Sequence, residues 1–212
     1  MNFKIEAPKI PALTSLETIQ IDFLQSKEEI NRCIISDCII EGQDASKVSF
    51  DKVLFKNVTF VECSLPGIEL TDTLFENCDL SNVDFSGAFV HRTVFQQCRM
   101  VGTDFADARF QNVRVLESLG DMAAFRFANL KQVSFENCSL LSADYYQSVL
   151  HSLAFSGCKL DQATFSGSRL KGIDLSDCDF TGLHVEIEDL NGCIISAQQA
   201  ASFAGLLGLV IK

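Results

Sequence analysis

Nine cysteines and three histidines are the residues of this chain that could bind a metal ion or act as nucleophiles. The cysteines are separated by multiples of five residues, at Cys33, Cys38, Cys63, Cys78, Cys98, Cys138, Cys158, Cys178 and Cys193. Zinc requires thiolates that converge on one point at about 2.3 Å each, and a catalytic thiol requires a neighbouring base. Whether these thiols converge depends on the elements that carry them.

The elements follow a repeat of five residues. From Ile30 to Ile195, every position divisible by five holds a large apolar residue, apart from Ala45 and Gly120. This period fits neither a helix, at 3.6 residues per turn, nor a strand, at 2.0, and it indicates a repeat architecture. The residue two positions earlier is small or β-branched, and Asn and Gly are favoured two positions later. We expect five residues to form one side of a square coil of about 20 residues, with coils stacked through parallel strands about 4.8 Å apart.

In such a coil every cysteine occupies the small inward position. A twenty-residue coil places six of them in a row on one wall, at Cys38, Cys78, Cys98, Cys138, Cys158 and Cys178. A row does not converge on one ion, so we interpret the cysteines as compact apolar residues. His91 and His151 share a wall but lie three coils, about 14 Å, apart. We therefore predict no enzymatic activity, no metal site and no cofactor.

Composition limits the partners. The chain has 212 residues and a formal charge of −11, and direct binding to nucleic acid requires a basic surface instead. No apolar run approaches the roughly 20 residues that a membrane span needs, and the first residues lack the layout of a secretory signal. We expect a cytoplasmic protein, in which disulfides between neighbouring coils are disfavoured.

The repeat also divides the chain. We expect residues 1–29 to form an N-terminal cap, in which Ser26 and Glu29 have the spacing of a capping box at the start of a helical turn. Residues 30–195 form the β-helix, and residues 196–212 form a short helix and tail. The glycine at position 120 predicts a kink, with Leu119 or Met122 filling the gap.

The apolar residues of the tail have two interpretations. They cover the last coil, or they form the interface of a homodimer through the C-terminal end. The candidate dimer residues are Phe203, Leu206, Leu207, Leu209, Val210 and Ile211.

Several units carry a family resemblance. The segments CDLSN (78–82), VDFSG (83–87), TDFAD (103–107) and IDLSD (173–177) resemble the pentapeptide-repeat family, whose fold is all-β, a right-handed quadrilateral β-helix. Residues 87–95, 102–107, 124–129 and 170–176 and the tail 198–211 are similar to Qnr-type proteins of Gram-positive bacteria, the enterococcal one especially. This finer resemblance implies a DNA-mimicking protein that binds DNA gyrase and topoisomerase IV, protects them from fluoroquinolones and dimerises through its C-terminal ends. Many Qnr-type proteins have protecting loops that interrupt the repeat, and here the phase never breaks, as in the loopless branch.

The outward charges identify candidate contact residues. Sorting them by twenty gives three acidic walls and one mildly basic wall. Rows of fixed carboxylates would attract a groove built for phosphates, although an ordinary solvated surface has the same composition. The candidate partner-binding residues are Asp84, Asp104, Asp107, Asp144, Asp79 and Asp179. The exposed apolar residues Leu116, Leu119, Met122 and Phe127 are expected to cluster near Gly120 as a further candidate contact site. The alternatives are an interaction scaffold with a partner other than a topoisomerase, and an immunity factor against a gyrase-directed toxin.

Overall fold

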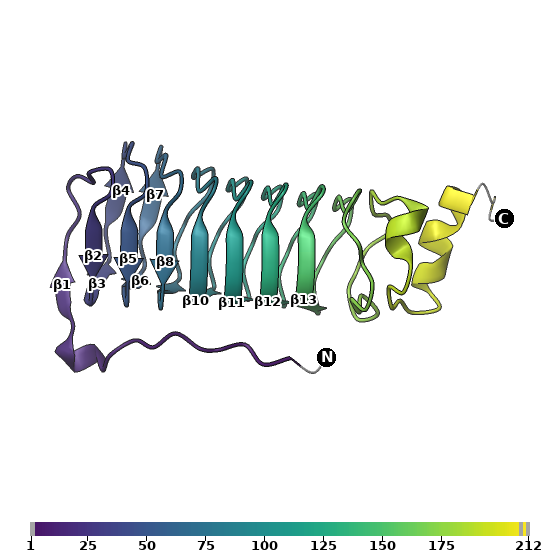
Figure 1. Cartoon of the computed structure of the whole chain (residues 1–212), viewed down its shortest axis with the longest axis horizontal. Helices are drawn as coiled ribbons and strands as arrows, with labels where there is room; N and C mark the ends of the chain where they lie inside the picture. The colour runs from purple at the N-terminus through teal and green to yellow at the C-terminus, as the bar shows by residue number, and fades with distance from the viewer. Residues whose placement is uncertain (1–2, 208–209, 211–212) are drawn as a thin grey trace.

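The protein is a rod of stacked coils (Figure 1). The structure is a computed structural model that describes residues 3–207, apart from the side chain of Leu207, and residue 210. From one coil to the next, parallel strands pair with a register of twenty residues, for example Phe89 with Arg109 and Val94 with Arg114. The all-β fold predicted from the repeat, a quadrilateral β-helix, is confirmed, and the described residues contain very little helix.

Strands form two adjoining walls along most of the rod. The order along the main sheet is β1 (Glu17–Ile19), β3 (Cys33–Ser36), β6 (Leu54–Lys56), β9 (Leu74–Glu76), β10 (Phe89–Gln96), β11 (Arg109–Leu116), β12 (Asn129–Glu136) and β13 (Val149–Ser156). Beside it, β2 (Glu29–Asn31) pairs with β5 (Ser49–Asp51), which pairs with β8 (Glu69–Thr71), which pairs with β10; elsewhere β4 (Ile39–Glu41) pairs with β7 (Thr59–Val61). Single bridges such as Asp84 to Asp104 continue the other two walls.

The corners of the coils explain the preference for Asn and Gly. The residue two positions after the inward apolar residue has a left-handed backbone, as at Asn57 (φ 54°), Asn77 (φ 53°) and Gly87 (φ 67°). Asn and Gly tolerate this region better than other residues do. The chain therefore turns at a fixed point in each repeat and brings the next large apolar residue inward.

Stacked rings fill the interior. On one wall the ring centroids of Phe75 and Phe95 lie 4.9 Å apart. On the opposite wall Tyr145 lies between Phe125 and Phe165, with centroid distances of 4.9 Å to each. These rings are at most 2% exposed, so the column of fives forms one continuous core.

The coil stays regular at Gly120, so the predicted kink is wrong. The Gly120 N–H donates to the carbonyl of Ser139 at 2.7 Å, in register with the next coil. Leu140 of that coil takes up the free space, because a Cβ built on Gly120 would lie 3.0 Å from its Cδ2 atom. Leu119 and Met122 do not fill the gap; they are 45% and 61% exposed.

The first coil is closed by β1 and the residues after it. β1 pairs in parallel with β3, and Leu24 is 1% exposed with its N–H donating to the side-chain oxygen of Gln43 at 2.7 Å. The helical turn predicted from Ser26 and Glu29 is wrong. Ser26 lies in a tight turn. Glu29 is the first residue of β2 and pairs with Ser49 of β5.

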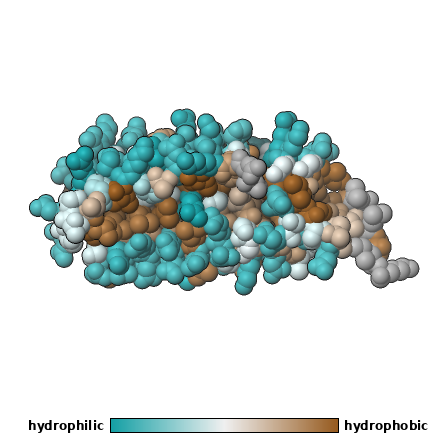
Figure 2. Space-filling view, turned by 90° about the horizontal axis from the view of Figure 1, so that it is seen from below, coloured by the Kyte–Doolittle hydropathy of each residue, from teal (hydrophilic) through white to brown (hydrophobic). Residues whose placement is uncertain are grey.

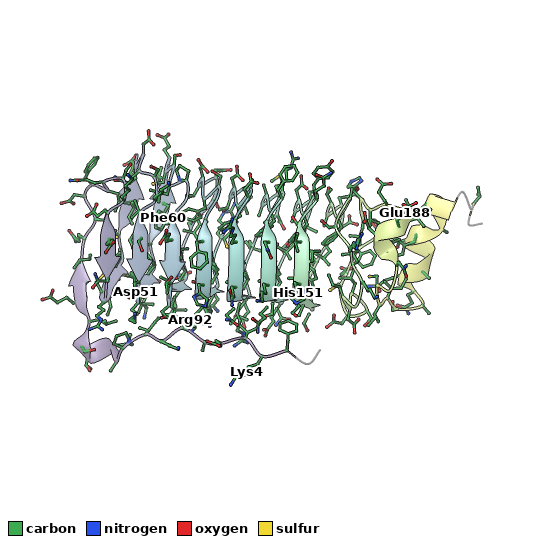
Figure 3. All side chains as sticks on the ribbon, viewed as in Figure 1. Lys4, Asp51, Phe60, Arg92, His151 and Glu188 are labelled. Atoms are coloured by element: carbon green, nitrogen blue, oxygen red, sulfur yellow. The ribbon has the colours of Figure 1, made fainter. Side chains whose placement is uncertain are left out.

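Residues 3–12, which we name the N-terminal strap, run along the side of the rod (Figures 1 and 3). The 3₁₀ helix η1 (Leu13–Ser15) joins this extended segment to β1. The predicted N-terminal cap over the first coil includes these residues. Their course along a wall is an additional feature that the repeat does not predict.

The 3₁₀ helix η2 (Ile187–Leu190) lies within the last coil, and the 3₁₀ helix η3 (Gln199–Leu207) follows it. Ser196 and Gln199 cap η3 reciprocally: each backbone N–H donates to the other side chain, at 2.8 Å from Ser196 and 3.3 Å from Gln199. The Gln199 amide also donates to the carbonyls of Leu175 and Cys178, at 2.8 and 2.7 Å. The side chain thus satisfies backbone acceptors that no further coil covers. Among the described residues, no helix is long and apolar enough to cross a membrane.

Candidate partner-binding surfaces

The cysteines line the interior as free thiols. Some of the thiols donate to backbone carbonyls of the preceding coil, among them Cys138 to Val115 at 3.4 Å and Cys158 to Phe135 at 3.3 Å. Burial raises the pKa of Cys33 to about 11, so this thiol is neutral at neutral pH and is a poor nucleophile. Within residues 3–207, no three Cys, His, Asp or Glu side chains gather in a group that could hold an ion.

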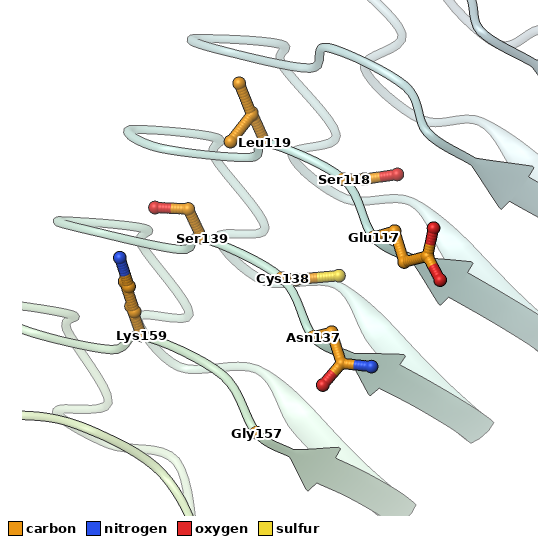
Figure 4. A pocket seen from close by; sticks show the side chains of 8 residues that line it. All are labelled: Glu117, Ser118, Leu119, Asn137, Cys138, Ser139, Gly157 and Lys159. Carbon is orange, nitrogen blue, oxygen red and sulfur yellow. The ribbon is translucent and has the colours of Figure 1, made fainter.

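A shallow depression of about 210 Å³ lies beside the cysteine row (Figure 4). Ser118 and Cys138 point inward and are 1% and 2% exposed, while Leu119, Ser139 and Lys159 point the other way. The depression therefore has no converging set of reactive groups.

The predicted aspartates Asp84, Asp104 and Asp144 lie in one column, as expected. We name this side of the rod, with the corner that carries Asp107, the aspartate wall. Asp84 pairs directly with Asp104, and Ala124 separates Asp104 from Asp144. Adjacent coils place the Cα atoms of paired residues about 4.8 Å apart.

Backbone hydrogen bonds hold these carboxylates in place. In each, Oδ1 accepts the N–H two residues later, from Ser86 to Asp84 at 2.9 Å, from Ala106 to Asp104 at 2.8 Å and from Tyr146 to Asp144 at 2.9 Å. Burial alone would raise the pKa of Asp84, but hydrogen bonds from Ser86 and Ser64 hold it below its usual value. The aspartates thus stabilise the turn through Oδ1, and Oδ2 of Asp84 accepts the hydroxyl of Ser64 at 2.9 Å.

The aspartate wall changes character along the rod. Asp144 forms an ion pair with Arg126, at 2.5 Å between Oδ2 and Nε. Among the described residues, no ion pair includes Asp84, Asp104 or Asp107. The free negative charge of this wall is therefore concentrated in the coils before residue 110.

The other two predicted aspartates, Asp79 and Asp179, belong to a different wall. Asp79 lies 3.9 Å from the Nε atom of Arg99, and Asp179 pairs with Lys159 of the preceding coil through the backbone. The structure therefore does not bring all six predicted aspartates onto one surface.

The four predicted apolar contact residues also fail to form one patch. Leu116 lies in β11, Leu119 bridges to Ser139 on the next wall, and Met122 and Phe127 occupy two successive corners, with φ of 58° and 59°. Five residues carry the chain past each corner, so neighbours in sequence point to different sides. The expectation of a single cluster is wrong for this reason.

The N-terminal strap, which the sequence pattern did not predict, reaches the carboxylate of Asp72 on the mildly basic wall. Lys9 donates its N–H to Oδ1 of Asp72 at 2.9 Å. Arg92 donates to both oxygens of Asp72, at 2.6 and 2.8 Å. The side chains of Asp72 and Arg92 are 2% and 16% exposed, so this ion pair is largely desolvated beneath the strap.

Two further contacts extend along the same corner column. Glu6 donates its N–H to Oδ1 of Asn112 at 3.1 Å, and the Gln132 amide donates to the carbonyl of Lys4 at 3.0 Å. Figure 2 shows apolar side chains along the middle of this face, with hydrophilic residues on both sides. The half-buried residues of the strap are Phe3, Ile5, Pro8, Ile10 and Pro11. Their near-alternation is the signal that could have identified an extended segment packed against a wall.

The buried ion pair shifts two pKa values. Burial alone would raise the pKa of Asp72, but the hydrogen bonds and charge of Arg92 and the N–H of Lys9 hold it below its usual value. Burial and the charge of Arg92 lower the pKa of His91, whose ring lies 3.1 Å from that guanidinium. The mildly basic wall is thus partly neutralised beside the strap.

The predicted dimer residues are divided. Phe203 is 8% exposed and packs against Phe180 with ring centroids 5.9 Å apart, so it belongs to the core of its own chain. Leu206 and Val210 are 40% and 85% exposed. Leu209, Ile211 and the side chain of Leu207 lie outside the described residues.

Comparison with known proteins identifies the family. The family model described as "Pentapeptide repeat region" matches residues 68–137 and 128–201. The chain belongs to the pentapeptide-repeat family. It is 41% identical over 208 residues to the uncharacterized protein YisX of Bacillus subtilis (strain 168), covering 98% of this chain and 97% of that protein.

Two solved structures are also similar. Full-length QnrB1, a plasmid-mediated fluoroquinolone resistance protein, has a TM-score of 0.45 and 17% identity, with 83% of this chain and 100% of that chain covered. HetL, a pentapeptide repeat protein involved in heterocyst differentiation regulation from the cyanobacterium Nostoc, has a TM-score of 0.45 and 16% identity, with 81% and 90% covered.

Proposed function

We propose that this protein mimics DNA, binds DNA gyrase or topoisomerase IV, and protects the enzyme from fluoroquinolones. The observation that carries the proposal is the free part of the aspartate wall. Asp84 and Asp104 stand one coil apart with their carboxylates tied to the backbone, and Asp107 adds a third at the corner.

Fixed carboxylates suit this role for an energetic reason. Exposed charges on flexible side chains contribute little, because ordering them costs conformational entropy. Here the turn has already ordered them, so a basic groove meets a preformed row of negative charge. The net charge of −11 extends the attraction beyond the contact, and binding should weaken steeply as salt is added.

The resemblance to Qnr-type proteins is the basis for the proposed partner. The units quoted above are similar to Qnr-type proteins, and the phase of the repeat admits no protecting loop. Protection must then come from the walls of the rod themselves. Occupation of the DNA site by the aspartate wall is one way to destabilise the complex that a fluoroquinolone traps.

A homodimer completes the proposal. Leu206 and Val210 are exposed beyond the last coil, where a two-fold contact would cover them and double the length of the rod. Light scattering at micromolar concentration tests this: a dimer mass supports the interface, and a monomer mass rejects it.

The function is tested by gyrase supercoiling in the presence of ciprofloxacin, with added protein and across a salt series. We expect restored supercoiling at low salt and little effect at high salt. The triple variant Asp84→Asn, Asp104→Asn and Asp107→Asn keeps the turns and should lose this effect. Glu41→Gln, an exposed acid in β4 on another wall, is the matched control and should behave as the unchanged protein. If the protein neither rescues nor inhibits supercoiling at any concentration, the topoisomerase proposal is rejected and the scaffold alternative remains.

A further inference from the structure

Two aromatic side chains are exposed together on the aspartate wall. Phe127 is 50% exposed and Tyr146 is 37% exposed, and their rings meet edge to face with centroids 5.7 Å apart. Large exposed rings carry no benefit for the core, which the inward rings already fill. An exposed aromatic pair of this kind is typical of a contact site.

The backbone at Phe127 supports a role outside folding. Phe127 has a φ of 59°, in the left-handed region that a bulky residue rarely adopts. The same corner in neighbouring coils is occupied by smaller or polar residues, Gly87 and Asp107 before it and Gln147 and Gly167 after it, all with positive φ. A phenylalanine here adds local strain and exposed apolar surface, and strained residues concentrate at functional sites.

The pair is also held rigidly. Phe127 donates its N–H to the carbonyl of Tyr146 at 3.0 Å, and Tyr146 donates its N–H to Asp144 at 2.9 Å. The Gln147 amide donates to the Tyr146 hydroxyl oxygen at 3.0 Å, and Arg126 holds Asp144 from the other side. Little freedom remains to be lost on binding, which favours affinity.

The rings continue directly from the free carboxylates. Asp107 occupies the corner one coil before Phe127 and donates its N–H to the carbonyl of Arg126 at 2.8 Å. Asp104 pairs with Ala124, whose small side chain does not obstruct access to the carboxylates and the rings on either side of it. A single partner surface can therefore contact both within about two coils, roughly 10 Å.

We propose that Phe127 and Tyr146 are the apolar anchor of the aspartate wall, and that the partner is a protein with an apolar pocket beside a basic groove. This inference rests on the function proposed above and adds what a DNA mimic lacks, because a row of phosphates presents no aromatic side chain. The carboxylates steer the partner and make binding depend on salt, and the anchor supplies the part of the affinity that salt does not remove.

The test measures binding of the full-length protein to purified gyrase and to topoisomerase IV across a salt series. Phe127→Asn removes the ring and places a residue suited to the left-handed corner, and Tyr146→Ser removes the second ring. Each should weaken binding roughly tenfold or more at every salt concentration, because buried aromatic anchors are typical hot spots. Neutralising Asp104 and Asp107 should instead reduce the salt dependence, because it weakens binding most at low salt.

Phe89→Ser is the matched control, because Phe89 is 39% exposed in β10 and Ser49 occupies its position two coils earlier. It should bind as the unchanged protein does. Thermal unfolding of Phe127→Asn should show no loss of stability. If the unchanged protein, Phe127→Asn and Tyr146→Ser bind with equal affinity at all salt concentrations, the anchor proposal is rejected and the proposed function stands. Absence of binding by the unchanged protein would reject the proposed function and, with it, the anchor.

Discussion

Aspartate has opposite roles at the corner beneath the N-terminal strap and on the aspartate wall. Asp72 lies beneath the strap, accepts bonds from Lys9 and Arg92 and is almost fully buried. Asp104 is half-buried on an uncovered wall, accepts one backbone hydrogen bond, and forms no ion pair among the described residues. The repeat places both at its polar positions, so the surrounding chain decides whether a carboxylate supports the fold or remains available for a partner.

The largest expected effect comes from neutralising Asp72. Asp72→Asn keeps a residue suited to the left-handed corner but leaves the Arg92 guanidinium without its counter-charge in a desolvated site. We expect a loss of about 2–3 kcal/mol in the free energy of unfolding, measured with urea. Asp107→Asn is the matched control, at the same repeat position with a similar φ, and should change stability by less than about 0.5 kcal/mol. Equal losses would erase the distinction between the two regions.

The same pair predicts a pH dependence. The folded state holds the pKa of Asp72 below its usual value, so this group contributes stability that is fully present above the pKa of an unfolded aspartate, about 3.9, and is lost as the pH falls through the lower folded pKa. Urea unfolding at decreasing pH should show the difference between the unchanged protein and Asp72→Asn shrinking below about pH 4. A difference that stays constant would mean that the charge of Asp72 does not stabilise the fold.

A smaller effect is expected for the next contact of the strap. Asn112→Gly removes the acceptor for the Glu6 N–H and keeps a residue that tolerates the φ of 57°. We expect a loss of about 1 kcal/mol. Hydrogen exchange should show faster exchange of the Glu6 amide and an unchanged rate at Lys9, whose acceptor is Asp72. Faster exchange at both positions would show that the strap detaches as one unit.

The smallest effect on stability is expected on the aspartate wall. Asparagine can accept the same turn hydrogen bonds, so the double variant Asp84→Asn and Asp104→Asn should unfold within about 0.5 kcal/mol of the unchanged protein. Its affinity for the partner should fall all the same. A marked loss of stability would show that these charges serve the fold as Asp72 does.

The repeat made the core predictable to the residue, because one rule decides which side chains point inward. The same rule placed the cysteines in a row and Asp84, Asp104 and Asp144 in a column. Its failures have definite causes. Gly120 was expected to disturb the coil, but Leu140 of the next coil occupies the space.

The predictions based on neighbours in sequence failed for another reason. Leu116 and Phe127 are eleven residues apart, and two corners separate them. The strap obeys no repeat at all: its contacts with Asp72 and Asn112 span 63 and 106 residues, and local patterns carry little information about such pairings.

The twenty-residue register gives every outward side chain two independent coordinates, its height along the rod and its direction around it. Deletion of twenty residues would shift every residue after the deletion by one coil along the rod and would keep the direction of each side chain. Deletion of five would turn the remainder by a quarter of a circle, so the aspartates and the aromatic pair would no longer face the same way. The core would be packed equally well in both cases. In this fold, the pattern offered to a partner can therefore change while the packing that holds the chain together does not.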